Sequence, residues 1–292
     1  MRYAYFPGCS AESTAREMHQ STLAVARALG IDLVEPQGWT CCGATAGHQT
    51  DRFLAASLPA ANLVKVQDMK LEMVVNCAAC YNRMKVANHE IATHAPMRRR
   101  VGDALSRDYD GSVKVRHLLE VLLEDVGLEV ITKAVTRPLE GLKVACYYGC
   151  LLVRPPKILK FDDPENPASL DRLVRALGAK SLEWPCKVEC CGGGLSLSRT
   201  DVVVQLSVSI LDMAAAAGAD CIAVSCPMCQ VNLDLRQQDI RKQTGKDHQM
   251  PIVYITQLLG LGLGIGADDL GFSKLMIPAA RVLERVAGKR HE

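Results

Sequence analysis

Two sets of five cysteines are the residues of this sequence whose types and spacing could do chemistry. Each set reads Gly-Cys, a long gap, Cys-Cys-Gly, a second long gap and then Cys-x-x-Cys. In a reducing compartment such cysteines are more often metal ligands or catalysts than disulfide partners. The sets are Cys9, Cys41, Cys42, Cys77 and Cys80, and Cys150, Cys190, Cys191, Cys226 and Cys229.

A constant offset relates the two sets. Cys41 and Cys190 are 149 positions apart, and the three cysteines after each of them keep that separation. The gap before Cys-x-x-Cys is 34 residues in both halves, whereas the first gap is 31 residues in one half and 39 in the other. Such a shared offset indicates an internal duplication. We therefore predict an N-terminal unit, 1–139, and a C-terminal unit, 140–292, divided near the Pro- and Gly-containing stretch 137–141.

Strands must alternate with helices to bring such distant cysteines together. The apolar runs predict a fold of the α/β class, with two pseudo-symmetric repeats that each hold a small parallel sheet flanked by helices. Ligands of such sheets gather beyond the carboxyl ends of the strands, where the repeated cysteines fall. The predicted strands are 3–6, 31–34, 72–75, 142–147, 180–183 and 221–224; the predicted helices are 14–29, 52–70, 169–177 and 202–217; a branched run enters a Leu-Leu pair at 113–119 and at 252–259.

Composition limits the classes of function. The chain has 292 residues, a net charge of +2 and 4% aromatic residues, which gives no reason to expect binding to nucleic acid. The apolar stretch 258–267 is ten residues long, and a membrane-spanning helix needs roughly 20. The first residues do not resemble a signal peptide. We therefore predict a cytoplasmic protein whose partners are proteins or a small molecule.

Three chemical interpretations of the thiols remain open at this point. Disulfides are disfavoured by the odd number of cysteines per half and by the strained geometry of bridging adjacent cysteines. Structural zinc takes four tetrahedral ligands and often uses Cys-x-x-Cys pairs, so each half could hold one ion with a cysteine left over. An iron–sulfur cluster fits best, and the fifth thiol suggests a cluster of unusual shape.

The doubled motif resembles a known family. The pattern Cys-x31-Cys-Cys-Gly…Cys-x-x-Cys looks like the cysteine-rich CCG domain. The stretch Cys146-Tyr-Tyr-Gly-Cys150-Leu-Leu-Val-Arg-Pro155, followed by Pro164-Glu-Asn-Pro167, resembles the B-type subunits of heterodisulfide reductase. The resemblance includes the related complexes of sulfur oxidation and covers nearly the whole chain.

This resemblance implies a function. It implies that the ten repeated cysteines are the catalytic and cofactor-binding ligands of two noncubane [4Fe–4S] clusters, one per motif. The Cys-x-x-Cys pairs leave zinc at one site as the lesser alternative. A disulfide bound between the clusters would be cleaved, or two thiols oxidised in reverse, by an oxidoreductase acting on sulfur groups. Partners would be a ferredoxin-like subunit of the C type and a flavin-containing subunit of the A type. The chain itself carries no flavin or nicotinamide fingerprint.

Two rival redox functions are a CCG electron-relay subunit of a glycolate, lactate or succinate dehydrogenase complex, and a sulfur-oxidation complex acting on a lipoyl-bound substrate. A zinc-stabilised scaffold is the non-redox alternative. Cys146 and Cys221 are expected to be core residues, and so is Cys186, although a spare redox thiol is the alternative there. A few other side chains have a default structural role and an alternative at the site: His48 as a proton donor, Tyr147 and Tyr148 as walls of a substrate cavity, and Arg154 as a partner of an acidic substrate group.

Overall fold

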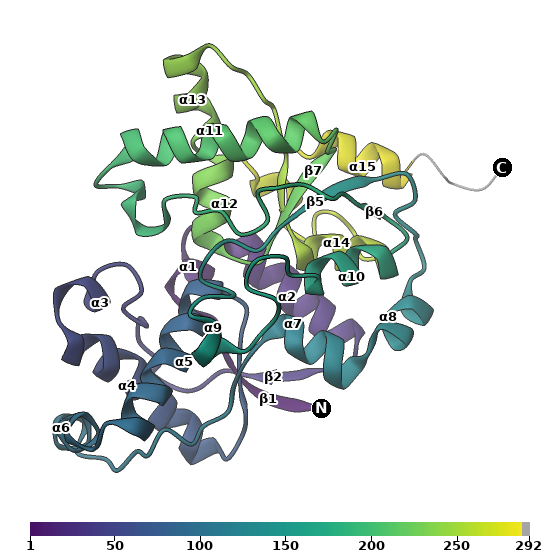
Figure 1. Ribbon diagram of the computed structural model, residues 1–292. Helices are drawn as coiled ribbons and strands as arrows, with labels where there is room; N and C mark the ends of the chain where they lie inside the picture. Colours follow the sequence, from purple (N-terminus) through teal and green to yellow (C-terminus); the bar gives the residue numbers. More distant parts are fainter. Residues whose placement is uncertain (288–292) are drawn as a thin grey trace.

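The computed structural model describes residues 1–287 and contains two four-stranded sheets, one in each half of the sequence (Figure 1). The strand orders, β2-β1-β3-β4 and β6-β5-β7-β8, correspond strand by strand, and neighbouring strands are parallel throughout. The predicted α/β class with two repeats is confirmed. The strands are β1 (Arg2–Phe6), β2 (Asp32–Val34), β3 (Met73–Val75), β4 (Val115–His117), β5 (Lys143–Tyr147), β6 (Lys180–Ser181), β7 (Cys221–Val224) and β8 (Ile252–Tyr254).

Continuous apolar runs form the central strands because helices cover both faces of each sheet. All residues of β3 and β7 are buried, and neither strand alternates polar with apolar residues. The edge strand β2 is more exposed than the central strands, and the edge strand β6 is both shorter and more exposed. Each carries a charged residue, which limits pairing with other chains. The loops that follow β3 and β7 thus lie inside the molecule.

The helices agree with the predicted ranges to within a few residues, except that 14–29 begins late: a separate short helix follows β1, and the main helix starts at Arg16. Among residues 1–287 no helix combines the length and the apolar character needed to cross a membrane. The helices are α1 (Cys9–Glu12), α2 (Arg16–Ala28), α3 (Gly47–Thr50), α4 (Arg52–Met69), α5 (Ala78–Thr93), α6 (Ala95–Leu105), α7 (Leu118–Glu120) with a π-helical turn (Val121–Val126), α8 (Leu128–Ala134), α9 (Pro156–Leu159), α10 (Ser169–Ala176), a 3₁₀ turn (Gly193–Ser196), α11 (Thr200–Ala216), α12 (Pro227–Asp234), α13 (Gln237–Thr244), α14 (Ile255–Gly262), a second 3₁₀ turn (Phe272–Lys274) and α15 (Ala280–Ala287).

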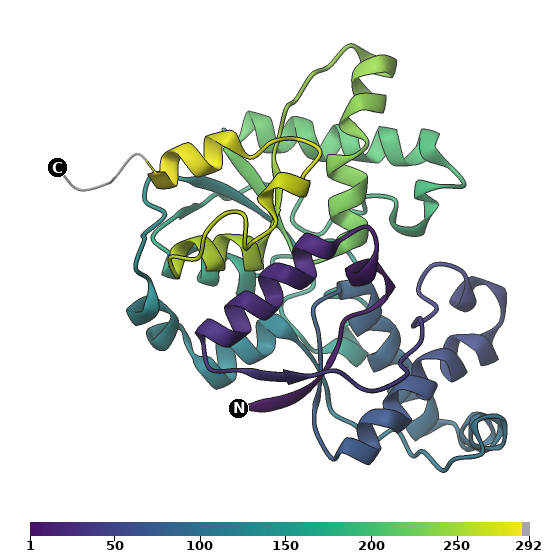
Figure 2. The same cartoon turned by 180° about the vertical axis from the view of Figure 1, so that it is seen from behind.

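The two halves share an interface in which α2 of the first half lies against α14 of the second (Figure 2). The hydroxyl groups of Ser21 and Thr256 are 2.7 Å apart there, and both residues are fully buried. Gly271, with a positive φ, approaches so closely that an added Cβ would lie 2.7 Å from Cβ of Glu17. The halves are therefore packed as one body, with the loops after the central strands near the interface.

A buried ion pair ties together the elements around the C-terminal cysteine loops. Asp171 on α10 is fully buried, and its carboxylate accepts hydrogen bonds from Tyr148 at 2.5 Å and from Ser181 at 2.6 Å. The ammonium group of Lys187 lies 3.2 Å from the same carboxylate. Because Tyr148 follows β5 and Lys187 follows β6, this network fixes the two loops relative to each other.

Replacing Gly260 by alanine should destabilise the protein. The new Cβ would lie 2.2 Å from Cδ2 of Leu270, and overpacking of this kind costs about 1–3 kcal/mol. We expect a lower midpoint of urea-induced unfolding for Gly260→Ala. The matched control is Gly266→Ala, whose added Cβ would meet only the flexible carboxylate of Asp269, at 3.4 Å. An equal loss of stability in both variants would contradict the proposed packing.

Removing the cation of the buried pair should cost more than removing one on the surface. Lys187→Met leaves the carboxylate of Asp171 buried without its ammonium partner, for which we expect a loss of about 3–5 kcal/mol in the free energy of unfolding. Arg199→Met breaks an exposed pair with Asp201 and should change the free energy of unfolding little, because solvent screens an exposed ion pair. Chemical denaturation of the two variants measures the difference, and similar costs would show that the pair does not behave as a buried one.

Candidate metal centres

The five cysteines of the N-terminal set come together beyond the carboxyl ends of β1, β2 and β3. Cys9 begins α1, the vicinal pair lies in the loop after β2, and Cys77 caps the start of α5. The sulfur atoms of Cys9 and Cys41 are 4.0 Å apart, and those of Cys42 and Cys80 are 3.2 Å apart. Direct thiol contacts also join Cys41 to Cys42 and Cys77 to Cys80. One continuous set of contacts therefore connects all five thiols.

The C-terminal set repeats this arrangement. The thiols of Cys150 and Cys190 are in contact, as are those of Cys226 and Cys229. The sulfur atoms of Cys191 and Cys229 are 3.7 Å apart, which corresponds to the Cys42–Cys80 contact of the first half. The five thiols thus occupy equivalent positions around β5, β6 and β7.

The two sets meet each other inside the molecule. The thiols of Cys77 and Cys226, the first residues of the two Cys-x-x-Cys motifs, interact directly across the interface between the halves. Both residues are buried, whereas Cys9, Cys41 and Cys190 are exposed. We call the contact between Cys77 and Cys226 the junction of the two sites. Each site therefore extends from an exposed thiol at the surface to a buried thiol at this junction.

Glycine is required beside each site because a sulfur atom approaches the backbone closely. A Cβ on Gly8 would lie 3.1 Å from Sγ of Cys80, and a Cβ on Gly149 would lie 3.0 Å from Sγ of Cys229. Both glycines have a positive φ, which other residues rarely adopt. The glycine of each Gly-Cys motif thus leaves room for a sulfur atom of the same set.

Backbone amides point at sulfur in both halves. The amide of Gly43 donates to Sγ of Cys41 at 3.4 Å, and the amide of Gly192 donates to Sγ of Cys190 at the same distance. Such N–H groups stabilise the thiolate form, which is the form that binds metal. The glycine of each Cys-Cys-Gly motif is therefore a hydrogen-bond donor and also adopts a positive φ.

Buried thiols of both sets, Cys42 in the first and Cys191 and Cys226 in the second, have a lowered pKa, which favours the thiolate form. Hydrogen bonds from the thiols of Cys41 and Cys80 hold the pKa of Cys42 well below its usual value. Hydrogen bonds from the thiols of Cys229 and Cys77 do the same to the pKa of Cys226. The start of α12 lies beside Cys226 and adds the positive end of a helix dipole. Negative charge is thus favoured at the buried end of the C-terminal site.

The donor set fits an iron–sulfur cluster. Each half supplies five thiols, backbone N–H donors aimed at sulfur, and glycines that make room for sulfur. Within residues 1–287 no group of three or more histidine, cysteine, aspartate or glutamate side chains has the arrangement of a single-ion site.

The three cysteines outside the repeat lie in the protein interior. Cys146 in β5 and Cys221 in β7 are fully buried, and burial raises the pKa of both thiols. Cys186 is buried near the surface, and burial raises its pKa as well. Cys146 and Cys221 therefore behave as small core residues, as expected from the sequence.

The other residues singled out in the sequence have structural partners or stay untested. Tyr147 donates to the carbonyl of Glu189 at 2.6 Å, and both Tyr147 and Tyr148 are buried in the core. Arg154 pairs with Glu165 at 2.9 Å on the surface. His48 is half-buried with Nδ1 unpaired, so its role as a proton donor stays a prediction.

Sequence reasoning missed two buried polar residues at the junction, His117 and Tyr254. The register pairs Val75 with His117 in the first sheet and Val224 with Tyr254 in the second, so the two residues are equivalent. Matching the Leu-Leu pairs of the two halves would have aligned His117 with Gln257, three positions too far. Each of the two residues stands just before a helix, and the side chain three positions later accepts a hydrogen bond from its backbone amide. This shared helix start is the sequence signal that would have aligned His117 with Tyr254.

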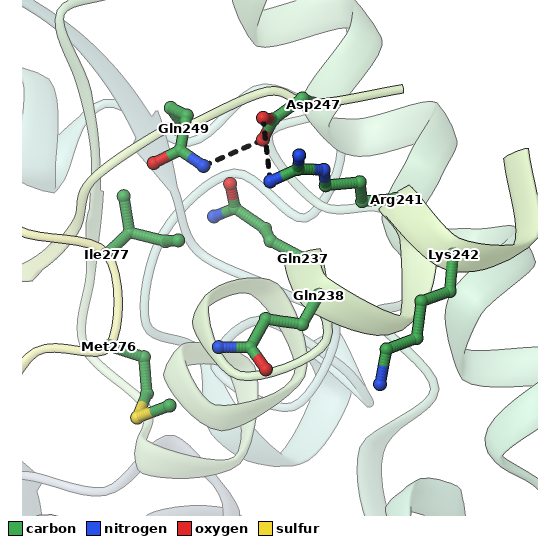
Figure 3. A pocket seen from close by; sticks show the side chains of 8 residues that line it. All are labelled: Gln237, Gln238, Arg241, Lys242, Asp247, Gln249, Met276 and Ile277. Carbon is green, nitrogen blue, oxygen red and sulfur yellow. Dashed lines mark hydrogen bonds and ion pairs between the residues drawn. The ribbon is translucent and has the colours of Figure 1, made fainter. Parts of the chain in front are cut away.

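A pocket of about 560 Å³ lies elsewhere, between α13 and residues 276–277 (Figure 3). Asp247 accepts a hydrogen bond from Gln249 there and pairs with Arg241 at 3.3 Å. No cysteine lines this pocket. The redox-capable groups of the molecule are therefore at the cysteine sites and not in this pocket.

Known proteins resemble this chain over nearly its whole length. The model of the cysteine-rich CCG domain matches the chain twice, at residues 3–85 and 144–234. The chain is 34% identical to the 8-methylmenaquinol:fumarate reductase membrane anchor subunit of Wolinella succinogenes, over 96% of this chain and 98% of that protein. It is 30% identical to the B-type subunit of the ferredoxin:CoB-CoM heterodisulfide reductase of Methanosarcina mazei, over 98% of this chain and 97% of that protein.

A solved structure shares the fold. The crystal structure of a hypothetical protein from Helicobacter pylori superposes with a TM-score of 0.74 at 11% identity. The match covers 94% of this chain and 52% of that one, so this chain corresponds to about half of that protein.

Since both cysteine sets fall within the two matched domains, the chain belongs to the family of cysteine-rich CCG-domain iron–sulfur proteins that includes the B-type subunits of heterodisulfide reductase.

Proposed function

We propose that this chain is the iron–sulfur catalytic subunit of a complex that carries out thiol/disulfide redox chemistry. Cys9, Cys41, Cys42, Cys77 and Cys80 would hold one noncubane [4Fe–4S] cluster, and Cys150, Cys190, Cys191, Cys226 and Cys229 the other. When bound, such clusters supply one-electron redox chemistry at sulfur. The reaction is the reductive cleavage of a disulfide or the reverse oxidation of two thiols.

The observation that carries this proposal is the contact between the two sites at Cys77 and Cys226. Cleavage of a disulfide to two thiols takes two electrons and two protons. Two adjacent one-electron sites could supply the electron pair to one S–S bond, whereas two distant sites could not do so together. A subunit that only relays electrons needs one site at each step and gains nothing from two complete sites in contact.

In this proposal, other groups of the chain provide access to the sites, stabilise negative charge on sulfur and exclude water. The exposed thiols Cys9, Cys41 and Cys190 place one end of each site at the surface, where a substrate or a partner can reach it. The amides of Gly43 and Gly192 stabilise negative charge on sulfur at those exposed ends. The buried junction excludes water from the other end, which protects reduced sulfur from side reactions.

Partners are part of the proposal because the electrons must come from outside the chain. Relatives are described as subunits of ferredoxin-dependent heterodisulfide reductases and of a menaquinol:fumarate reductase. We therefore propose a ferredoxin-like subunit of the C type as the immediate electron donor, with a flavin-containing subunit of the A type behind it. A cytoplasmic location fits such partners, and a disulfide substrate could be a small molecule or be bound to a protein through a lipoyl group.

A second candidate function is electron relay. It is favoured by the 34% identity to a fumarate reductase membrane anchor subunit and by a match to a probable glycolate oxidase iron–sulfur subunit of Bacillus subtilis. In that case the clusters would exchange electrons with a quinone or a partner protein, and no disulfide would bind. The two functions differ in whether a sulfur substrate changes the environment of the clusters.

Iron content tests the ligand assignment. The chain purified without oxygen should contain about eight irons and eight sulfides. Cys42→Ala and Cys191→Ala each remove one buried ligand and should lower iron by about half while the other site stays filled. Cys221→Ala changes a fully buried cysteine outside the repeat and should keep all the iron. Two zinc ions and no sulfide in the wild-type chain would overturn the redox proposal.

The response to sulfur compounds separates catalysis from relay. Addition of a small disulfide to the reduced protein, or of its thiols to the oxidised protein, should change the electron paramagnetic resonance spectrum of the clusters. The spectrum of Cys42→Ala, with one site lost, should not respond in the same way, because cleavage needs both sites. A response to a quinol analogue, with none to disulfides or thiols, would instead establish the relay function.

A further inference from the structure

Two buried hydrogen-bond donors without acceptors flank the junction of the two sites. His117 ends β4 and Tyr254 ends β8, so they occupy equivalent positions in the two sheets. His117 is 0% exposed and Tyr254 is 1% exposed. Neither Nε2 of His117 nor the hydroxyl of Tyr254 has a hydrogen-bond partner among the described residues.

The hydrogen-bonding pattern of His117 identifies which ring nitrogen carries the proton. Nδ1 accepts a hydrogen bond from the backbone amide of Leu119 at 3.2 Å, so it must be unprotonated. Burial favours the neutral ring, which then carries its single hydrogen on Nε2. The rings of Tyr81 and Phe161 hold the imidazole by edge-on contacts. Nε2–H is therefore a fixed donor without an acceptor.

Tyr254 presents the same feature from the other half. Its backbone amide donates to Oε1 of Gln257 at 2.9 Å, which fixes the residue at the start of α14. The phenol lies within electrostatic range of both Cys226 and Cys77. The carboxylates of Glu17 and Asp234 also lie within electrostatic range of it. Its hydroxyl is thus a second buried donor beside the junction.

An acceptor is needed, because a buried donor without a partner is costly and rare in folded proteins. Cys226 also lies within electrostatic range of His117, and the backbone of Ser225 is close but makes no hydrogen bond of normal geometry with Nε2. A thiol is a weak acceptor, whereas the thiolate of a metal ligand is a strong one. The paired thiols of Cys77 and Cys226 are therefore the natural acceptors once they are ligands.

We propose that His117 and Tyr254 are positioning residues that donate hydrogen bonds to the ligand thiolates of Cys226 and Cys77 at the junction of the two iron–sulfur sites. The proposal rests on the proposed function, since it requires both cysteines to be ligands. Hydrogen bonds to ligand sulfur raise the reduction potential of a cluster. The paired donors would hold both clusters at potentials high enough to accept electrons from a common donor.

The test removes each donor while keeping the fold. Tyr254→Phe deletes only the hydroxyl. His117→Asn keeps an acceptor for the Leu119 amide at the start of the helix but shortens the side chain that carries the donor. Tyr109→Phe is the matched control, because Tyr109 is equally buried and its hydroxyl bonds to Asn88, outside the sites.

The readouts are the midpoint potentials of the clusters, from redox titration followed by electron paramagnetic resonance, and the coupling of exchangeable protons, from electron–nuclear double resonance in H₂O and D₂O. We expect Tyr254→Phe and His117→Asn to lower at least one midpoint potential and to lose an exchangeable-proton coupling each. Iron content should stay at the wild-type level in both variants, and Tyr109→Phe should match the wild type in every measurement.

Unchanged potentials and couplings in Tyr254→Phe and His117→Asn, with iron retained, would overturn this inference and leave the proposed function intact. A wild-type chain without iron would overturn both. A shift that Tyr109→Phe produces to the same extent would also contradict the inference, since it would show a general effect of losing a buried hydroxyl.

Discussion

Parallel pairing of the strands is the constraint on which the rest of this structure depends. In a parallel sheet every strand ends at the same edge, so the loops after β1, β2 and β3 must be neighbours. Cysteines separated by more than 30 residues in the sequence are thereby brought to within 4.0 Å of one another. The same parallel pairing in the second sheet brings the second set of cysteines together.

The packing of the two halves brings the two cysteine sites into contact. The contact of α2 with α14 includes a buried hydroxyl pair, and it holds the strand ends of both sheets toward a common interior. Cys77 and Cys226 meet there, and both are buried. Burial of unpaired hydrogen-bond donors and of an ion pair would be unfavourable in an ordinary core. Their concentration around the cysteine sites is typical of functional sites, where the local structure is less stable than an ordinary core would be.

Near-symmetry of the repeats has limits that matter for function. The cysteines and their glycines occur in both halves, so the two cysteine sets are alike. The residue at the end of the fourth strand differs, being a histidine in one half and a tyrosine in the other. Burial lowers the pKa of His117 to about 3, which keeps the imidazole neutral at ordinary pH. Both residues can therefore donate a single hydrogen bond, but from groups of different strength and shape.

The sequence by itself determined the duplication, the ten cysteines, the parallel α/β fold class and most element boundaries. These features are encoded locally, since strand and helix periods, turn glycines and repeat offsets can all be read from neighbouring residues. The division into units 1–139 and 140–292, and the ligand role of each cysteine, stay predictions from the sequence. Tertiary structure alone decided that Cys77 lies against Cys226 and that His117 is the equivalent of Tyr254. The reason is physical: contacts between halves depend on how α2 packs on α14 and on strand register, and neither is encoded in the spacing of residues along one chain segment.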